Sequence, residues 1–136
     1  ALRVYMYAVI AGKGPEEFLL RKNIIEKKLQ NNLQLIGEIT HTNLLQMMLQ
    51  TKVFLHPSSY EGFSMACLEA LYAGCHVISF TKPMHYNIEH WHIVTTKEEM
   101  VGKTIEILSL PDMEYKPMMP YSINETAKSI MQLFGQ

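Results

Sequence analysis

Short apolar runs alternate with segments of helical periodicity along most of this chain. The β-forming runs predict strands over residues 4–11, 33–36, 53–56, 76–80 and 90–95. Helices are predicted over residues 15–30, 40–50, 64–73, 97–108 and 122–134. The first run is apolar at consecutive positions, which predicts a strand buried on both faces, as in a parallel sheet. Within residues 40–50, the spacing predicts an inward face made of Leu44, Leu45, Met48 and Leu49.

Residues with strong positional preferences support these boundaries. Pro15 suits the first turn of a helix, and Ser64 suits the residue that caps one. Gly74 suits a helix C-terminus. Thr96 is expected to cap the helix that follows it, with Glu99 as its capping-box partner.

The alternation of strands and helices predicts an α/β fold: a Rossmann-like parallel sheet with helices on both faces. Ligands bind to such sheets at the carboxyl ends of the strands. Four loops are expected along that edge, at residues 12–15, 37–40, 57–64 and 81–89.

Composition narrows the class of protein. The 136 residues are enough for one domain, predicted over residues 1–136, and 48% of them are hydrophobic. A net charge of -1 gives no bulk attraction to nucleic acid or to an anionic membrane. No apolar run approaches the ~20 residues of a membrane span, and no signal peptide opens the chain. Because the chain begins with Ala1 and enters a strand almost directly, we expect a fragment of a longer protein.

The two cysteines indicate a reducing compartment. Cys67 falls in the first turn of a predicted helix and Cys75 just beyond its end, which places their Cα atoms ~12 Å apart. This separation is too long for a disulfide. We therefore expect two unreactive reduced thiols and a cytoplasmic location, with membrane association through the missing part of the protein as an extension.

Two glutamates flank a predicted helix start. Glu61 lies in a turn before Ser64, and Glu69 lies inside the helix that Ser64 begins. A helix N-terminus attracts anions, because its first N–H groups lack partners and its dipole is positive there. The carboxylates suit hydroxyl groups on either side of a bound diphosphate, which is the layout of a nucleotide sugar. The alternative is that Glu61 complements the helix dipole and Glu69 is a solvated surface charge.

The segment from Pro57 to Ser79 resembles the signature of the retaining glycosyltransferases with the GT-B fold, of the group 1 or family 4 type. That signature has proline–serine, then Glu-Gly-Phe-Gly, a second glutamate eight positions after the first, a glycine and Pro-Val-Ile. Upstream, residues 10–15 resemble its Gly-x-Gly-Pro turn, and residues 35–37 resemble its Phe-x-Gly strand end. The resemblance covers residues 4–134 and implies the C-terminal, donor-binding half of such an enzyme.

The resemblance also implies roles for single residues. Glu69 would bind the ribose hydroxyls, and Glu61 would be catalytic, beside the donor sugar and its breaking bond. Ser64 and Met65 would offer backbone N–H groups to the diphosphate. The other implied donor-binding residues are Gly62, Phe63, Gly12, Gly14, Ile36 and Gly37, with the last two near the base.

The implied reaction is retaining sugar transfer from a nucleotide-diphosphate sugar to a glycan or lipid, as in polysaccharide biosynthesis. No cofactor and no metal are implied. The implied partners are the nucleotide sugar and an N-terminal acceptor-binding domain that this chain lacks. The isolated fragment is therefore expected to be inactive. His85, His90 and His92 lack nearby Cys or Asp partners, which disfavours a metal site.

Departures from the family pattern keep a second function open. His76 stands where the family often has proline, and the loop 81–89 lacks the usual Gly-Gly pair, with only Glu89 as a match. Lys13 and Lys82 lie at the expected edge but match no family cation. The alternative function is a non-catalytic nucleotide-binding or interaction module with the same fold. A response-regulator-like domain is disfavoured, because the acidic cluster after the first strand is missing.

Overall fold

The computed structural model describes residues 6–60, 64–82 and 87–111, together with residues 122, 124, 128, 131 and 132. The chain divides into two compact units, Ala1–Leu44 and Leu45–Gln136, which we call the N-terminal and C-terminal units. Most of the helix predicted over residues 122–134 lies outside the described residues.

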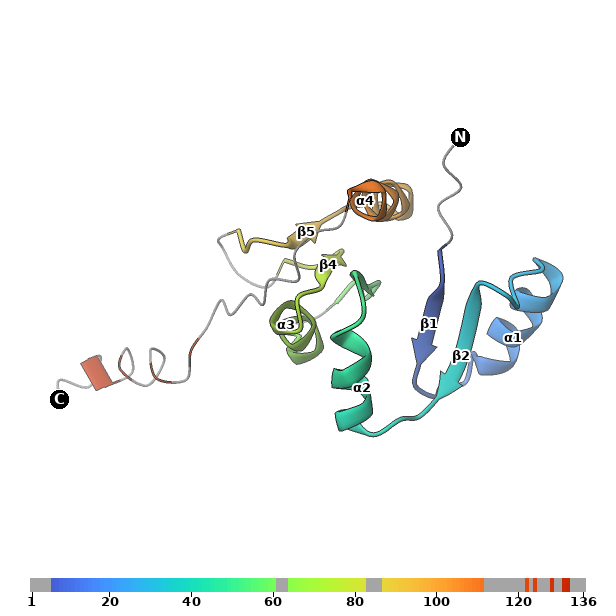
Figure 1. The fold of residues 1–136 in the computed structure, drawn as a ribbon, viewed down its shortest axis with the longest axis horizontal. Helices are drawn as coiled ribbons and strands as arrows, with labels where there is room; N and C mark the ends of the chain where they lie inside the picture. Colours follow the sequence, from blue (N-terminus) through green and yellow to red (C-terminus); the bar gives the residue numbers. More distant parts are fainter. Residues whose placement is uncertain are drawn as a thin grey trace. The chain divides into compact units, whose positions relative to one another are not determined.

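The N-terminal unit is a parallel β-α-β element (Figure 1). It contains β1 (Ala8–Ala11), α1 (Glu17–Glu26) and β2 (Leu33–Gly37). The strands pair in register from Ala8 opposite Leu33, with an irregularity after Ile10. α2 (His41–Met48) follows β2 and crosses the boundary into the C-terminal unit.

Two burial predictions for this part of the chain are wrong. β1 is exposed or half-buried at every position, because it pairs with β2 in a two-stranded sheet of the described residues. Its residue Ile10 is 37% exposed. Leu49 is 59% exposed, because α2 ends at Met48 and the chain turns there. Leu44 and Leu45 are half-buried and Met48 is buried, as the spacing predicts.

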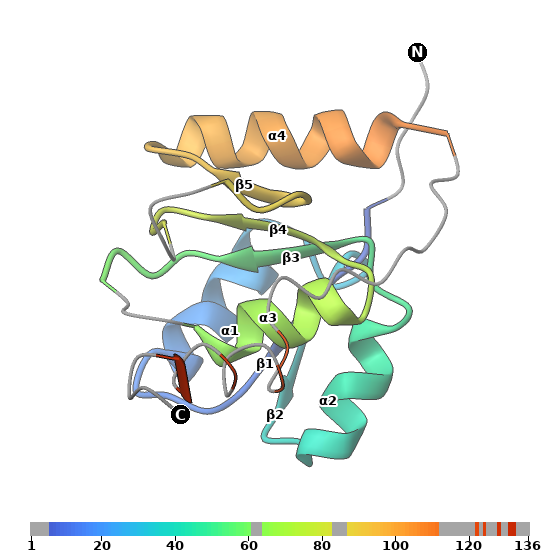
Figure 2. The same cartoon turned by 90° about the vertical axis from the view of Figure 1, so that its left-hand side faces the viewer.

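The C-terminal unit contains a three-stranded parallel sheet with the order β3-β4-β5. Its elements are β3 (Val53–His56), α3 (Met65–Tyr72), β4 (His76–Ser79), β5 (Trp91–Ile93) and α4 (Lys97–Ser109). Figures 1 and 2 show α3 on one side of this sheet and α4 on the other, and both helices contact β4 and β3. The predicted fold class, α/β with parallel strands and helices on both faces, is confirmed.

Buried apolar side chains on both faces of β4 hold this unit together. On the α4 side, Ile78 packs with Val94, Met100 and Ile107, and Val53 and Phe80 border this cluster. On the α3 side, the helix buries Cys67, Ala70 and Leu71, which have no exposed surface. All four residues of β4 are buried, as expected for the central strand of a covered parallel sheet.

The predicted helix caps of α3 are confirmed. The Cys67 backbone N–H donates to the Ser64 hydroxyl at 3.4 Å. At the other end Gly74 has φ 93, and its N–H donates to the Leu71 carbonyl at 3.0 Å. The N–H of Cys75 donates to the carbonyl of Ala70 at 2.9 Å, which completes a Schellman motif. Only glycine adopts this backbone conformation without a steric cost.

The start of α4 differs from the predicted capping box. The Thr96 hydroxyl accepts from the Glu99 N–H at 3.1 Å, as predicted for the cap. The Glu99 carboxylate, however, accepts from the N–H and hydroxyl of Thr95, at 2.7 and 2.8 Å. These hydrogen bonds hold the pKa of Glu99 below its usual range. The carboxylate therefore reaches one residue further back than a capping box requires.

Candidate functional site

The N-terminus of α3 lies at the carboxyl edge of the three-stranded sheet, because residues 57–64 connect it to the end of β3. Ser64 caps the helix, and the first intrahelical hydrogen bond runs from the Leu68 N–H to the Ser64 carbonyl at 3.3 Å. The N–H groups of Met65 and Ala66 have no carbonyl one turn earlier within the helix. Because the helix dipole is positive at this end, these groups are suited to a diphosphate.

Glu69 lies on the face of α3 that points away from the core. It is half-buried and is one helical turn beyond Met65, which is 62% exposed. Tyr72 continues this face and is 58% exposed. A ligand bound at the helix N-terminus can therefore reach the Glu69 carboxylate along the exposed side of the helix.

The loop from β3 to α3 is described up to Tyr60. The Ser58 hydroxyl donates to the Tyr60 carbonyl at 3.0 Å, and the Tyr60 side chain is 93% exposed. The predicted site residues Glu61, Gly62 and Phe63 lie outside the described residues.

The loop after β4 is anchored by a buried hydroxyl. Ser79 is fully buried, and its hydroxyl donates to the Thr81 carbonyl at 2.8 Å. The same oxygen accepts the indole N–H of Trp91 at 2.8 Å. This arrangement fixes the direction in which the chain leaves β4, at the edge where β3 also ends. Neither Ser79 nor Trp91 was among the predicted site residues.

We expect Ser79→Ala to destabilise the protein by about 1–3 kcal/mol, because the indole N–H and the Thr81 carbonyl lose a buried partner. Urea unfolding followed by tryptophan emission measures this change. Ser109→Ala is the matched control, since the exposed Ser109 hydroxyl donates to the Ile105 carbonyl on the surface of α4. Equal losses in the two variants would contradict the anchoring role.

The N-terminal unit carries a hollow of about 230 Å³ at the carboxyl ends of β1 and β2. Three predicted residues, Gly12, Gly14 and Gly37, line it together with the side chain of Leu35. Gly12 has φ 121, and its N–H donates to the Gly37 carbonyl at 2.7 Å. No atom lies within 4 Å of a Cβ built on any of these glycines, so backbone is open to a ligand there.

Ile36 and Lys13 lie near this hollow in different ways. Ile36 is half-buried and does not line it, because adjacent residues of a strand point to opposite faces. Lys13 forms an exposed ion pair with Glu38, with 3.6 Å between Nζ and Oε2. Its ammonium group is thus held beside the strand end of β2. The hollow belongs to the N-terminal unit, and Ser64, Met65 and Glu69 belong to the C-terminal unit.

The cysteines and histidines show no sign of metal or thiol chemistry within the described residues. Cys67 and Cys75 form no disulfide, as predicted, and both are buried. Burial raises the pKa of the Cys75 thiol to about 11, and the thiol donates to the Met48 carbonyl at 3.2 Å. Across the described part of the chain, no three His, Cys, Asp or Glu side chains are arranged to hold a metal ion.

Comparison with known proteins assigns the family. The sequence model of the glycosyl transferases group 1 family matches residues 3–116, most of the chain. The chain belongs to this family. The resemblance to group 1 glycosyltransferases, drawn from the glutamate segment, is therefore confirmed.

Several N-acetylglucosaminyltransferases match about half of the chain. The chain is 34% identical over 71 residues to the phosphatidylinositol N-acetylglucosaminyltransferase gpi3 subunit of Schizosaccharomyces pombe, covering 52% of this chain and 16% of that protein. It is 36% identical over 74 residues to the UDP-N-acetylglucosamine–peptide N-acetylglucosaminyltransferase GtfA subunit of Streptococcus pneumoniae, covering 54% and 14%. The chain thus spans less than a fifth of the length of these relatives.

A solved structure supports the fold. The crystal structure of the pneumococcal O-GlcNAc transferase GtfA in complex with UDP and GlcNAc matches with a TM-score of 0.56 and 26% identity. The match covers 74% of this chain and 21% of the other. The helices in the described part of the chain are all too short or too polar to cross a membrane.

Proposed function

We propose that this chain binds the nucleotide-sugar donor of a glycosyltransferase that transfers the sugar to a glycan or lipid. The capped N-terminus of α3, with Glu69 on the exposed face one turn further along, carries this proposal. The helix end suits the diphosphate, and the carboxylate suits the ribose hydroxyls because charged acceptors form the stronger hydrogen bonds.

The same helix end would assist the chemical step. Sugar transfer leaves a nucleoside diphosphate whose negative charge grows as the glycosidic bond breaks. N–H groups of Met65 and Ala66, fixed by the Ser64 cap, stabilise that charge without having to reorganise. In the proposed mechanism, Glu61 lies beside the donor sugar and the breaking bond. Catalysis then rests on positioning and electrostatics, with no cofactor taking part.

The first donor to test is UDP-N-acetylglucosamine. The matched relatives of S. pombe and S. pneumoniae are both named as N-acetylglucosaminyltransferases. Their named acceptors differ, a phosphatidylinositol and a peptide, so we propose no single acceptor molecule within the broader class. Both are also named as subunits, which supports an acceptor site built with a second domain or subunit.

Thermal unfolding with added nucleotide tests donor binding. A ligand that binds only the folded state stabilises it by about 2.7 kcal/mol at 100 times its dissociation constant. For a chain of this length, that corresponds to a rise in melting temperature on the order of 10 °C. We expect UDP-N-acetylglucosamine and UDP to produce the rise, and UMP to produce much less because it lacks the second phosphate.

GDP- and ADP-sugars test which nucleotide base the chain prefers. A rise with one of these and none with UDP would keep the donor-binding role and correct the base. No rise with any nucleotide sugar at millimolar concentration would contradict the proposal and favour a non-catalytic module of the same fold.

A further inference from the structure

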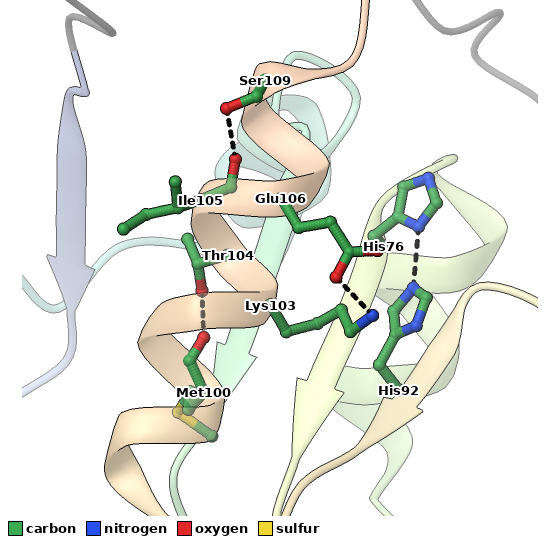
Figure 3. Close-up of polar contacts among 8 residues, drawn as sticks. All are labelled: His76, His92, Met100, Lys103, Thr104, Ile105, Glu106 and Ser109. Carbon is green, nitrogen blue, oxygen red and sulfur yellow. Dashed lines mark hydrogen bonds and ion pairs between the residues drawn. The ribbon is translucent and has the colours of Figure 1, made fainter.

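Three histidine rings stack at the amino-terminal end of β4, at the other end of the strand from Ser79. The ring centroids of His76 and His90 are 4.2 Å apart, and those of His76 and His92 are 5.3 Å apart. His76 Nδ1 and His92 Nε2 lie 3.0 Å apart and share one hydrogen bond, as Figure 3 shows. We call these three residues the histidine stack.

His76 is the buried member of the histidine stack, and His90 and His92 are half-buried. His76 is 7% exposed, and its Nε2 is buried with no hydrogen-bond partner in the described structure. The Nδ1 atom of His90 is buried in the same way. The backbone of His90 has φ 63, a left-handed conformation that is uncommon outside glycine. The fold therefore holds this ring over His76 at a conformational cost.

The described charged groups around the stack make a further positive charge there unfavourable. Lys52, just before β3, and Lys103 on α4 raise the local positive potential at His76 and His92. Glu106 on α4 faces His92, but its carboxylate pairs with the Lys103 ammonium at 2.6 Å (Figure 3). Glu89 lies 3.8 Å from His90 Nε2 and is largely exposed. Two protonated rings would thus repel each other and two lysines.

We propose that the histidine stack is an acid-sensitive contact between β4 and β5, on the side of the sheet where α4 packs. It holds β4, β5 and α4 together while the rings are neutral, and proton uptake below neutral pH loosens α4 from β4 and β5. Protonated rings need more water than this half-buried site supplies. Lys103 and Glu106 of α4 lie beside His92 (Figure 3), so moving α4 away admits that water.

The charges and burial around the stack determine how stability depends on pH and over which range. Burial, then the neighbouring His90, His92 and Lys52, lowers the pKa of His76 from 6.5 to about 4. Burial and Lys103 also lower the pKa of His92. An unfolded chain therefore binds more protons than the folded one between about pH 6.5 and 4. Stability is complete above the unfolded pKa and falls as the pH drops through this range.

The single tryptophan of the chain provides the readout. Trp91 lies between His90 and His92 in β5 and is 8% exposed, so its emission follows the opening of this region. Urea unfolding of the full chain at pH 7.5 and pH 5 gives the unfolding constant at each pH. From His76 alone, we expect this constant to rise about 30-fold on acidification.

Variants at His76 test whether the stack causes that rise. His76→Asn removes the titrating ring and places an amide nitrogen where Nδ1 meets His92. His76→Phe removes titration and keeps an aromatic ring in the stack. Both should leave a much smaller rise than the wild type. His41→Asn is the matched control, because His41 is exposed on α2, and it should retain the full rise.

Nuclear magnetic resonance on the wild type tests the proposal even if the variants fail to fold. We expect the ring protons of His76 to keep their neutral position through pH 6. Amide exchange, corrected for its intrinsic pH dependence, should speed up in α4 before it does in α3. A pH-independent unfolding constant, or a His76 ring that titrates near 6.5, would overturn the proposal. None of these measurements uses a nucleotide, so the donor-binding proposal is tested separately.

Discussion

Replacing Glu69 by alanine is expected to weaken binding of UDP-N-acetylglucosamine by at least about 100-fold. A carboxylate that accepts hydrogen bonds from two ribose hydroxyls contributes roughly 1.5–3 kcal/mol through each charged hydrogen bond. The loss would remove most of the thermal stabilisation by the donor. Glu69 is half-buried on α3, so the unfolding free energy of the ligand-free variant is measured beside its affinity to separate the two effects.

Glu98→Ala is the control for this prediction. Glu98 is exposed in the first turn of α4, so its removal should cost only a fraction of a kilocalorie per mole through the helix dipole. It should leave donor binding unchanged. Titration calorimetry of both variants at one temperature gives the dissociation constants directly. If Glu69→Ala binds as tightly as Glu98→Ala, the assignment of Glu69 to the ribose is wrong.

The α3 region was predictable from sequence because its signals are local. A serine that caps a helix and a glycine that ends one act within a few residues, and both Ser64 and Gly74 do so here. The strand Val53–His56 was also predicted with its observed bounds, since Pro57 stops it. Residues of α3 that share a face follow from the helical period, which places Glu69 outward and Leu71 inward.

Burial in the N-terminal unit could not be predicted in the same way. An apolar run such as that of β1 favours a buried strand. How far its side chains are buried depends on which strands and helices pack against it. In the structure β1 pairs with β2, and Ile10 remains partly exposed. Leu35 and Gly37 line the hollow and Ile36 does not. Strand alternation requires this once one of the three residues is known to lie there.

The histidine stack depends on strand register, which the sequence did not reveal. His76 and His92 are 16 residues apart, and parallel pairing of β4 with β5 sets Ile78 beside His92. His90 reaches the stack only through its left-handed backbone. The sequence disfavoured a metal site at His90 and His92 but did not show that the two residues meet His76, whereas the structure shows rings stacked on it.

Replacing Leu71 by alanine is expected to lower the free energy of unfolding by about 2–5 kcal/mol. Leu71 has no exposed surface, and α3 packs on β4 and β3, so the smaller side chain leaves a cavity in the centre of the unit. Urea unfolding followed by Trp91 emission measures the loss. Leu49→Ala is the matched control, because Leu49 is 59% exposed and should cost far less.

Leu71→Ala should nevertheless leave donor binding to the folded protein unchanged. Residues 69 and 71 are two positions apart on α3, about 200° around the helix, so Leu71 lies on the face opposite Glu69. Calorimetry at low temperature, where the variant stays folded, should give the wild-type dissociation constant for UDP-N-acetylglucosamine. The two variants therefore separate two roles of one helix. Folded Glu69→Ala loses affinity for the donor, whereas Leu71→Ala loses stability and keeps that affinity. Weaker binding by folded Leu71→Ala would show that core packing controls the geometry of the helix N-terminus.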